Sequence, residues 1–158
     1  MKLEVFNNPT LADFIQVIVK MPANERENFE ALTGQSYDVD TIAIGNFSTQ
    51  GPKWVVYADG IPISVGGFVY QRPGVWRDFM INTPEAWGQH GFQLTRICRR
   101  IMDAMFSSKQ AHRVDCISKA SRTNVRWHEV LGYNLEATLY GYCADGADAL
   151  LFSRVKHV

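Results

Sequence analysis

Apolar residues recur at helical spacing in one long segment of the second half of the chain. The apolar positions that share a face there are Leu94, Ile97, Cys98, Ile101, Met102 and Met105. The opposite face carries Gln93, Arg96, Arg99, Arg100 and Asp103. This pattern predicts an amphipathic helix that begins after Gly91 and packs its apolar face on a core. We expect its arginines to form a solvated face.

The first third of the chain predicts a short strand followed by helices. Leu3, Val5 and Phe6 suit a strand, and turn residues follow at 7–9. Thr10 can cap a helix through Ile18, with Asp13 as its capping-box partner. A second helix is expected from about Pro22 to Leu32, stopped by Gly34. Residues 35–53 fit a helix capped by Ser36 or a strand through Ile42 and Ile44, and we favour the helix.

Strand patterns dominate from residue 54 onward, apart from two helices. Residues 54–58 and 61–70 flank an Asp-Gly turn and predict a hairpin, and residues 75–81 predict a further antiparallel strand. After the long helix, a strand is expected at 113–118, then a helix from a Ser121 cap through Leu131 with Gly132 as its stop. A closing hairpin pairs about 134–143 with 149–155.

The element order β-α-α-β-β-β-α-β-α-β-β predicts an α/β fold with a mixed sheet. An antiparallel meander joins a β-α-β unit, and helices cover both faces. The one parallel junction lies between the fourth and fifth strands, where a ligand is expected to bind. No repeat or linker-like stretch divides the sequence, so a single domain over residues 1–158 is predicted.

Composition narrows the classes of partner. Hydrophobic residues make up 46% of the 158 residues and charged residues 20%, which is typical of a folded chain. Lys plus Arg number 16 and Asp plus Glu number 16, so no overall field attracts nucleic acid. We therefore expect no nucleic-acid partner.

Cysteine usage and hydropathy point to the cytoplasm. Cys98, Cys116 and Cys143 are odd in number and form no CxxC pair, which argues against a disulfide framework and against a metal site. Cys116 is expected to be a small buried hydrophobe rather than a nucleophile. No apolar run reaches the roughly 18 residues of a membrane span, and the first residues lack the apolar core of a signal peptide.

Residues 121–133, Ser-Arg-Thr-Asn-Val-Arg-Trp-His-Glu-Val-Leu-Gly-Tyr, are similar to motif B of the GNAT acetyltransferase superfamily. The predicted element order also resembles the GNAT fold. The stretches 87–96, 111–114 and 131–133 further resemble small acetyltransferase-like proteins carried by bacteriophages. The resemblance implies transfer of an acetyl group from acetyl-CoA (coenzyme A) to an amine by direct attack.

In the GNAT family a loop of the form Q/R-x-x-G-x-G/A precedes the central helix and binds the pyrophosphate of coenzyme A through backbone amides. Residues 86–91 occupy this place, and Gly91 matches while Ala86 and Gln89 depart from the pattern. Either the Gln89 side chain fills the phosphate space, or the loop slips by one residue and uses Gly88. The resemblance implies that cofactor-binding residues are Trp87, Gly88, Gln89, His90, Gly91 and Phe92, with Ser121 and Asn124 at the next helix.

Three side chains are candidates for the chemistry. His128 stands where many GNAT enzymes carry a tyrosine that returns a proton to the leaving thiolate, and a histidine can act as a general acid. An amine acceptor must also lose a proton before it attacks. Asp78 on the fourth strand is the first candidate for the base and Glu85 the second, although the strand register is not fixed by the sequence.

Two further functions compete with catalysis. The departures at Ala86, Gln89 and His128 also suit a GNAT-shaped binding module that has lost its acyl site, such as a phage inhibitor of a host enzyme. A minor virion component is a third reading. The acceptor of the enzyme is either a small amine or a protein, and the chain is expected to act as a monomer or homodimer. A gap between the fourth and fifth strands that is sealed by the chain's own side chains would contradict the transferase.

Overall fold

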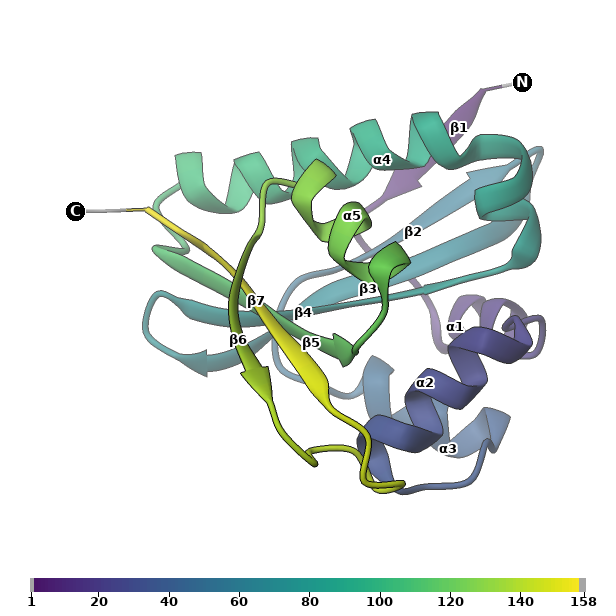
Figure 1. The fold of residues 1–158 in the computed structure, drawn as a ribbon. Coiled ribbons are helices and arrows are strands. Elements are labelled where there is room, and N and C mark those ends of the chain that lie inside the picture. The colour runs from purple at the N-terminus through teal and green to yellow at the C-terminus, as the bar shows by residue number, and fades with distance from the viewer. Residues whose placement is uncertain (1, 157–158) are drawn as a thin grey trace.

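The computed structural model describes residues 2–156, which form a seven-stranded sheet flanked by helices (Figure 1). The elements in chain order are β1 (Leu3–Phe6), α1 (Leu11–Ile18), α2 (Ala23–Thr33), α3 (Val39–Phe47), β2 (Lys53–Ala58), β3 (Ile61–Arg72), β4 (Val75–Asn82), α4 (Pro84–Ser107), β5 (Arg113–Lys119), α5 (Arg122–Val130), β6 (Asn134–Leu139) and β7 (Ala149–Val155).

The sheet is mixed, and its strand order is β1-β2-β3-β4-β5-β7-β6. All neighbouring strands run antiparallel except β4 and β5, which are parallel, as predicted. The β4–β5 ladder covers only Val75–Arg113, Trp76–Val114 and Arg77–Asp115. Beyond it β4 runs on to Asn82 and β5 to Lys119 without pairing with each other, while β4 stays paired with β3 and β5 with β7. We call this parting of the two carboxyl ends the fork.

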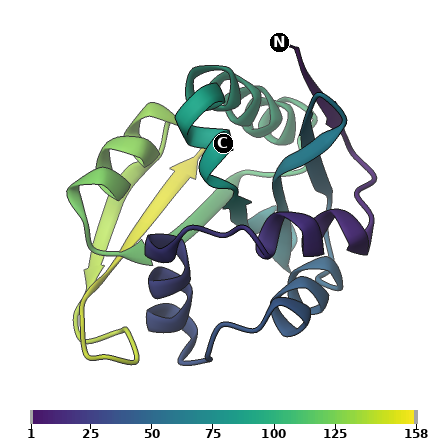
Figure 2. The ribbon, with the colours of Figure 1, turned by 90° about the vertical axis from the view of Figure 1, so that its right-hand side faces the viewer.

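Helices cover both faces of the sheet, as predicted (Figure 2). On one face α4 and α5 pack on Trp54, Phe68 and Val114 in the larger core. On the other face α1 and α3 pack on Val55 and Val65. No helix within residues 2–156 is long and apolar enough to cross a membrane.

The amino-terminal helices follow the signals in their sequences, with one correction. Thr10 and Asp13 form the predicted capping box of α1, and Gly34 ends α2 in the left-handed conformation, at φ 69°. The segment 35–53 contains the favoured helix, α3, but its cap is Asp38, whose side chain accepts the Thr41 amide. The prediction of Ser36 as the cap is wrong, because Asp38 directly precedes the first helical residue.

The start of α4 is a larger correction. The helix begins at Pro84, and Thr83 caps it by accepting the amide of Ala86. Pro84 suits the first helical position because its fixed φ is helical and its missing N–H would have no partner there. Glu85 adds a favourable charge to the first turn. The prediction that the helix follows Gly91 is wrong, and residues 86–91 are helix rather than loop.

Candidate functional site

A cavity of about 860 Å³ lies at the fork, where the parallel junction was predicted to bind a ligand. Its walls come from strands β2 to β5 and mainly from helices α2, α4 and α5. Trp54, Phe68 and Met80 contribute apolar surface. The polar and titratable groups among its lining residues include Glu25, Asp78, Asn82, Cys116, Asn124 and His128.

Asp78 lies in the wall of this cavity, and β4 fixes its position. The Tyr133 hydroxyl donates a hydrogen bond to Asp78 Oδ2, while the buried Oδ1 atom has no hydrogen-bond partner. Burial raises the pKa of Asp78 to about 6, although the Tyr133 and Cys116 side chains act in the opposite direction. A carboxylate with a free oxygen and such a pKa is suited to accept a proton near neutral pH.

His128 and Cys116 meet beside Asp78. His128 Nδ1 lies 2.6 Å from the carbonyl oxygen of Asn124, which can only accept, so Nδ1 carries the proton. His128 Nε2 therefore presents its lone pair to Cys116 Sγ at 3.4 Å. The imidazole stacks on Phe152 with 4.1 Å between ring centroids, and burial lowers its pKa. These contacts hold the His128 ring neutral and fix its orientation.

Cys116 is less isolated than its sequence context indicated. Burial and the neighbouring Asp78 raise the pKa of its thiol well above the ordinary value. The thiol is therefore protonated at neutral pH, and it can donate to His128. The structure brings Asp78, Cys116 and His128 together at one cavity, although only two of them were predicted as site residues.

Helix α2 spans the open end of the fork. Glu25 Oε2 accepts the backbone N–H of Asn82 at 3.3 Å, and Asn28 Oδ1 accepts the N–H of Lys119 at 2.9 Å. These two amides belong to the last residues of β4 and β5. Burial raises the pKa of Glu25, which hydrogen bonds from Asn82 and Trp87 partly offset. Sequence reasoning missed both α2 side chains, which are separated by more than fifty positions from the amides that they bind.

Comparison with solved structures identifies the architecture. The ribosomal-protein-S18-alanine N-acetyltransferase of Escherichia coli shares 13% identity at a TM-score of 0.74, over 99% of this chain and 96% of that chain. RimL, a ribosomal L7/L12 α-N-protein acetyltransferase in complex with coenzyme A, shares 11% identity at a TM-score of 0.73, over 97% of this chain and 93% of that chain. A GNAT-family acetyltransferase of Bacillus anthracis shares 10% identity at a TM-score of 0.73, over 98% of this chain and 95% of that chain. The chain has the GNAT fold.

Comparisons of the sequence find no match. No protein-family model matches the chain, and no curated protein matches it significantly. The fold expected from motif and element order is confirmed, whereas the similarity to bacteriophage proteins stays a prediction.

The helix α4 packs against the centre of the sheet, and α5 carries the residues that resemble motif B. Because α4 starts at Pro84, the backbone amides of its first turn lie at residues 85–87, several residues before Gly91. Trp87 of this turn meets Trp127 of α5 edge to face, with 4.3 Å between ring centroids, and both line the cavity. The first turn of α4 therefore forms the rim of the fork cavity.

The predicted cofactor residues separate into two groups. Trp87 and Asn124 line the fork cavity. The other predicted residues, which are not among its lining residues, are Gly88, Gln89, His90, Gly91, Phe92 and Ser121. His90 is buried with Nε2 unpaired, whereas Phe92 is 78% exposed. Ser121 caps α5 by accepting the amide of Asn124.

The two glycines of this stretch lie in the helix with open space around them. A Cβ at Gly88 would meet no atom within 4 Å, and a Cβ at Gly91 would make only an ordinary contact of 3.7 Å with Trp87. Packing within the chain therefore does not require glycine at either position. Glu85, the second candidate base, stands half-buried in the first turn of α4 and is not among the residues that line the cavity.

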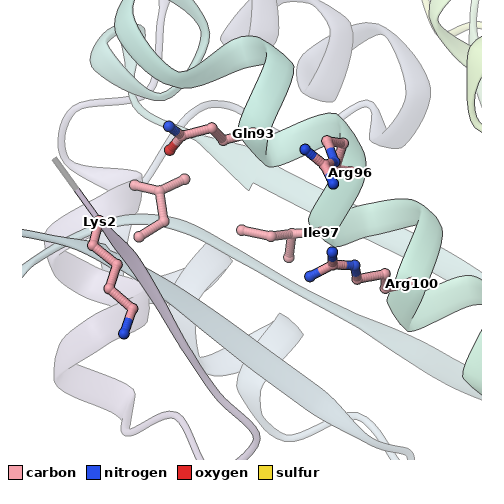
Figure 3. A pocket seen from close by; sticks show the side chains of 6 residues that line it. Lys2, Gln93, Arg96, Ile97 and Arg100 are labelled. Atoms are coloured by element: carbon pink, nitrogen blue, oxygen red, sulfur yellow. The ribbon is translucent and has the colours of Figure 1, made fainter.

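A second hollow, of about 420 Å³, lies at the β1 edge of the sheet, between β1 and α4 (Figure 3). Gln93, Arg96, Ile97 and Arg100 of α4 line it, together with Lys2 and Leu3. Both arginines are exposed, which fits the predicted solvated face. They lie away from the fork and do not contribute to its cavity.

Proposed function

We propose that the chain is an acyl-CoA-dependent N-acyltransferase that transfers an acetyl group from acetyl-CoA to an amine by direct attack. The observation that carries this proposal is the open fork cavity, into whose wall Asp78 brings a carboxylate with an unpaired oxygen. The GNAT fold and the acetyltransferase activity of its structural neighbours support it.

The surroundings of the fork fit a phosphate-bearing thioester in several respects. Thr83 accepts the amide of Ala86, so the first turn of α4 offers the backbone amides of Glu85 and Trp87 and the positive end of a long helix dipole. Gly88 leaves the outer side of the second turn free of side-chain atoms. Bound acetyl-CoA supplies an acetyl group already activated as a thioester. In this proposal Trp87 and Asn124 border the cofactor, and the unpaired β4 edge faces its arm.

Asp78 is the proposed general base. An amine acceptor arrives mostly as an ammonium ion, and the buried Oδ1 of Asp78, which has no hydrogen-bond partner within residues 2–156, is the atom proposed to take its proton. With a pKa of about 6, the carboxylate is ionised at pH 7 yet remains a stronger base than an ordinary aspartate. Tyr133 holds the other oxygen, which fixes the direction in which Oδ1 points.

His128 is not in the protonation state that a proton donor requires. Its Nε2 is unprotonated and faces the Cys116 thiol, and its lowered pKa favours the neutral ring. An acid role for His128, as the family resemblance implies, therefore requires prior protonation. We propose that its main task at pH 7 is to orient Cys116 beside Asp78.

Calorimetric titration with acetyl-CoA, followed by an assay of coenzyme A release with a panel of amines, tests the proposal. We expect binding, and we expect release that depends on the amine and is lost in Asp78→Asn. Absence of binding at millimolar acetyl-CoA would remove the transferase. Desulfo-coenzyme A provides a control for binding without chemistry.

One observation favours a binding module as the second candidate. Glu25 and Asn28 already occupy the last backbone amides of β4 and β5, so the chain closes part of its own fork. A protein partner recognised by the GNAT-shaped surface, such as a host enzyme if the chain is phage-encoded, would not need acetyl-CoA. Purification of the tagged protein with one stoichiometric partner, unchanged by Gly91→Glu, would support this candidate.

A further inference from the structure

The α2 side of the fork cavity has a consistent chemical character. Apart from the thiols and His128, the titratable residues that line the cavity are Glu25, Arg77 and Asp78. The guanidinium of Arg77 is engaged by Asp115, with Nε 2.8 Å from Oδ1. The two carboxylates are therefore the charges of the cavity that remain for a ligand, and the space between them is negative.

Glu25 is an unusual choice for a residue that only holds a strand end. Its carboxylate accepts the Asn82 amide, a task that a neutral side chain also performs, as Asn28 does at Lys119, and the Trp87 and Asn82 side chains offset only part of the effect of burial on its pKa. Removing a carboxylate from water has a cost in free energy, and the raised pKa of Glu25 reflects that cost. A cationic group bound beside Glu25 would offset it.

Glu25 belongs to α2, and the β4 residue whose amide it binds indicates the length of a ligand that reaches both carboxylates. Asp78 and the Asn82 amide that binds Glu25 are four positions apart on one strand. At about 3.3 Å per residue, this separates the two positions by about 13 Å. Asn24, Asn28 and Asn124 supply hydrogen-bonding groups around this space, and Phe29 and Met80 supply apolar surface.

We propose that the acceptor is a linear diamine or longer polyamine, whose reacting amine lies at Asp78 while a second ammonium group binds Glu25. This inference rests on the proposed function and names its substrate class. Glu25 and Asp78 are half-buried in the cavity walls. A flexible, unbranched ligand suits this cavity because it must bring a charged group to each of the two walls. Glu25 is a binding residue in this proposal and takes no part in proton transfer.

The experiment compares linear diamines of increasing length with the monoamine of the same carbon chain. We expect kcat/KM to be about tenfold or more higher for the best diamine than for its monoamine, because only the diamine adds a charge-assisted hydrogen bond at Glu25. We also expect an optimum in chain length. Glu25→Gln should lower kcat/KM for the diamine about tenfold, mainly through KM, and change the monoamine less than threefold.

Two controls separate this effect from misfolding. Glutamine retains an oxygen for the Asn82 amide, so Glu25→Gln should keep the fork closed and the melting temperature near that of the wild type. Glu27→Gln removes a charge from an exposed position of the same helix and should leave all amines unaffected. Equal use of monoamines and diamines, or a basic peptide that outperforms every diamine, would overturn the proposal.

Calorimetry with the diamine alone distinguishes the failure of this inference from the failure of the transferase. If the wild type binds the best diamine, Glu25→Gln weakens that binding and no amine is acetylated, the transferase fails while the diamine site stands. If amines are acetylated but the diamine binds no better than its monoamine, the transferase stands and the diamine site fails. Absence of diamine binding and of turnover removes both.

Discussion

Asp78 experiences opposite demands from folding and from chemistry. A base must be ionised to accept a proton, whereas burial at the fork favours the protonated acid and raises its pKa to about 6. Below pH 4 the acid is protonated in both the folded and the unfolded chain. The raised pKa means that protonation of Asp78 favours the folded chain. As the pH rises to about 6, only the unfolded chain readily releases the proton, so the stability that protonation contributes is lost.

Asp78→Asn should therefore abolish activity and stabilise the protein. The amide oxygen can still accept the Tyr133 hydroxyl, and no buried charge remains. A raised pKa of this size corresponds to a gain of the order of 1–3 kcal/mol in the free energy of unfolding at pH 7, and to little gain at pH 4. We expect kcat to fall about 100-fold or more. Urea unfolding at both pH values and a steady-state assay measure the two effects, and an active variant would contradict the assignment of the base.

Tyr133→Phe tests the orientation of the same carboxylate. The hydroxyl of Tyr133 lowers the pKa of Asp78, so its removal should move the pKa of the base upward from about 6. The acidic limb of the kcat/KM profile should shift to higher pH by the same amount. Stability should fall by about 1.5–3 kcal/mol at pH 7, because a hydrogen bond to a charged group is lost.

Tyr57→Phe provides the matched control for this prediction. The Tyr57 hydroxyl donates to the Asp13 carboxylate, away from the residues that line the fork cavity. Its removal should also cost stability, yet leave the pH profile of activity in place. Identical profiles for the two variants would show that Tyr133 has only a structural role.

At the residue scale, the sequence identified side chains but could not identify their neighbours. Asp78 and His128 were selected for their chemical types and their strand or motif positions, and both lie at the cavity. The contact of Cys116 with His128 joins β5 to α5, and its register depends on packing that no local pattern encodes. Glu25 was missed for the same reason, because α2 alone contains no signal for the amide of Asn82.

At the scale of single elements, a substitution at Gly88 of α4 should have opposite effects on stability and on acetyl-CoA binding. Glycine inside a helix costs about 1 kcal/mol relative to alanine, and a Cβ at Gly88 would meet no atom within 4 Å. Gly88→Ala should therefore raise the free energy of unfolding by roughly 0.5–1 kcal/mol. If the open side of this turn receives the cofactor phosphates, the same methyl group should weaken acetyl-CoA binding severalfold.

Gly45→Ala is the control for the α4 prediction. Gly45 lies in α3, and a Cβ there also meets nothing within 4 Å. The substitution should produce a similar gain in stability without any change in the dissociation constant for acetyl-CoA. Differential scanning calorimetry and titration calorimetry measure both quantities. Equal affinities for acetyl-CoA in the two variants would place the phosphates elsewhere.

The start of α4 illustrates how local signals and a family pattern can conflict. Thr83, Pro84 and Glu85 form a cap, a first-turn proline and a favourable charge, which favour a helix from residue 84, yet the helix was predicted to begin after Gly91. The glycines and the family's loop pattern suggested a later start. The apolar face from Leu94 to Met105 was recognised without ambiguity, because it repeats over several turns and Leu94, Cys98, Met102 and Met105 are buried.

At the scale of the whole molecule, the fork is the seam between two parts of the sheet. Strands β1 to β4 form one antiparallel part, and β5 to β7 form the other. Their direct pairing ends at Arg77 and Asp115, and α2 connects the open ends through Glu25 and Asn28. Hairpin signals predicted the β2–β3, β3–β4 and β6–β7 pairings, whereas the place of β7 between β5 and β6 and the bridging by α2 depend on tertiary placement.

Asn28→Ala should loosen the seam on the β5 side. The backbone N–H of Lys119 would lose its 2.9 Å hydrogen bond in a partly buried place, which costs about 1–2 kcal/mol. Hydrogen exchange should accelerate at the carboxyl end of β5 more than in the antiparallel ladders, because only this amide loses its acceptor.

Asn28→Asp keeps an acceptor oxygen and should behave nearly like the wild type, and Asn24→Ala on the exposed side of α2 provides the null variant. If Asn28→Ala and Asn24→Ala unfold at the same urea concentration, α2 does not hold the fork, and the closed edge seen there is set by the hairpin that packs on α2 near Ala31 and Cys143.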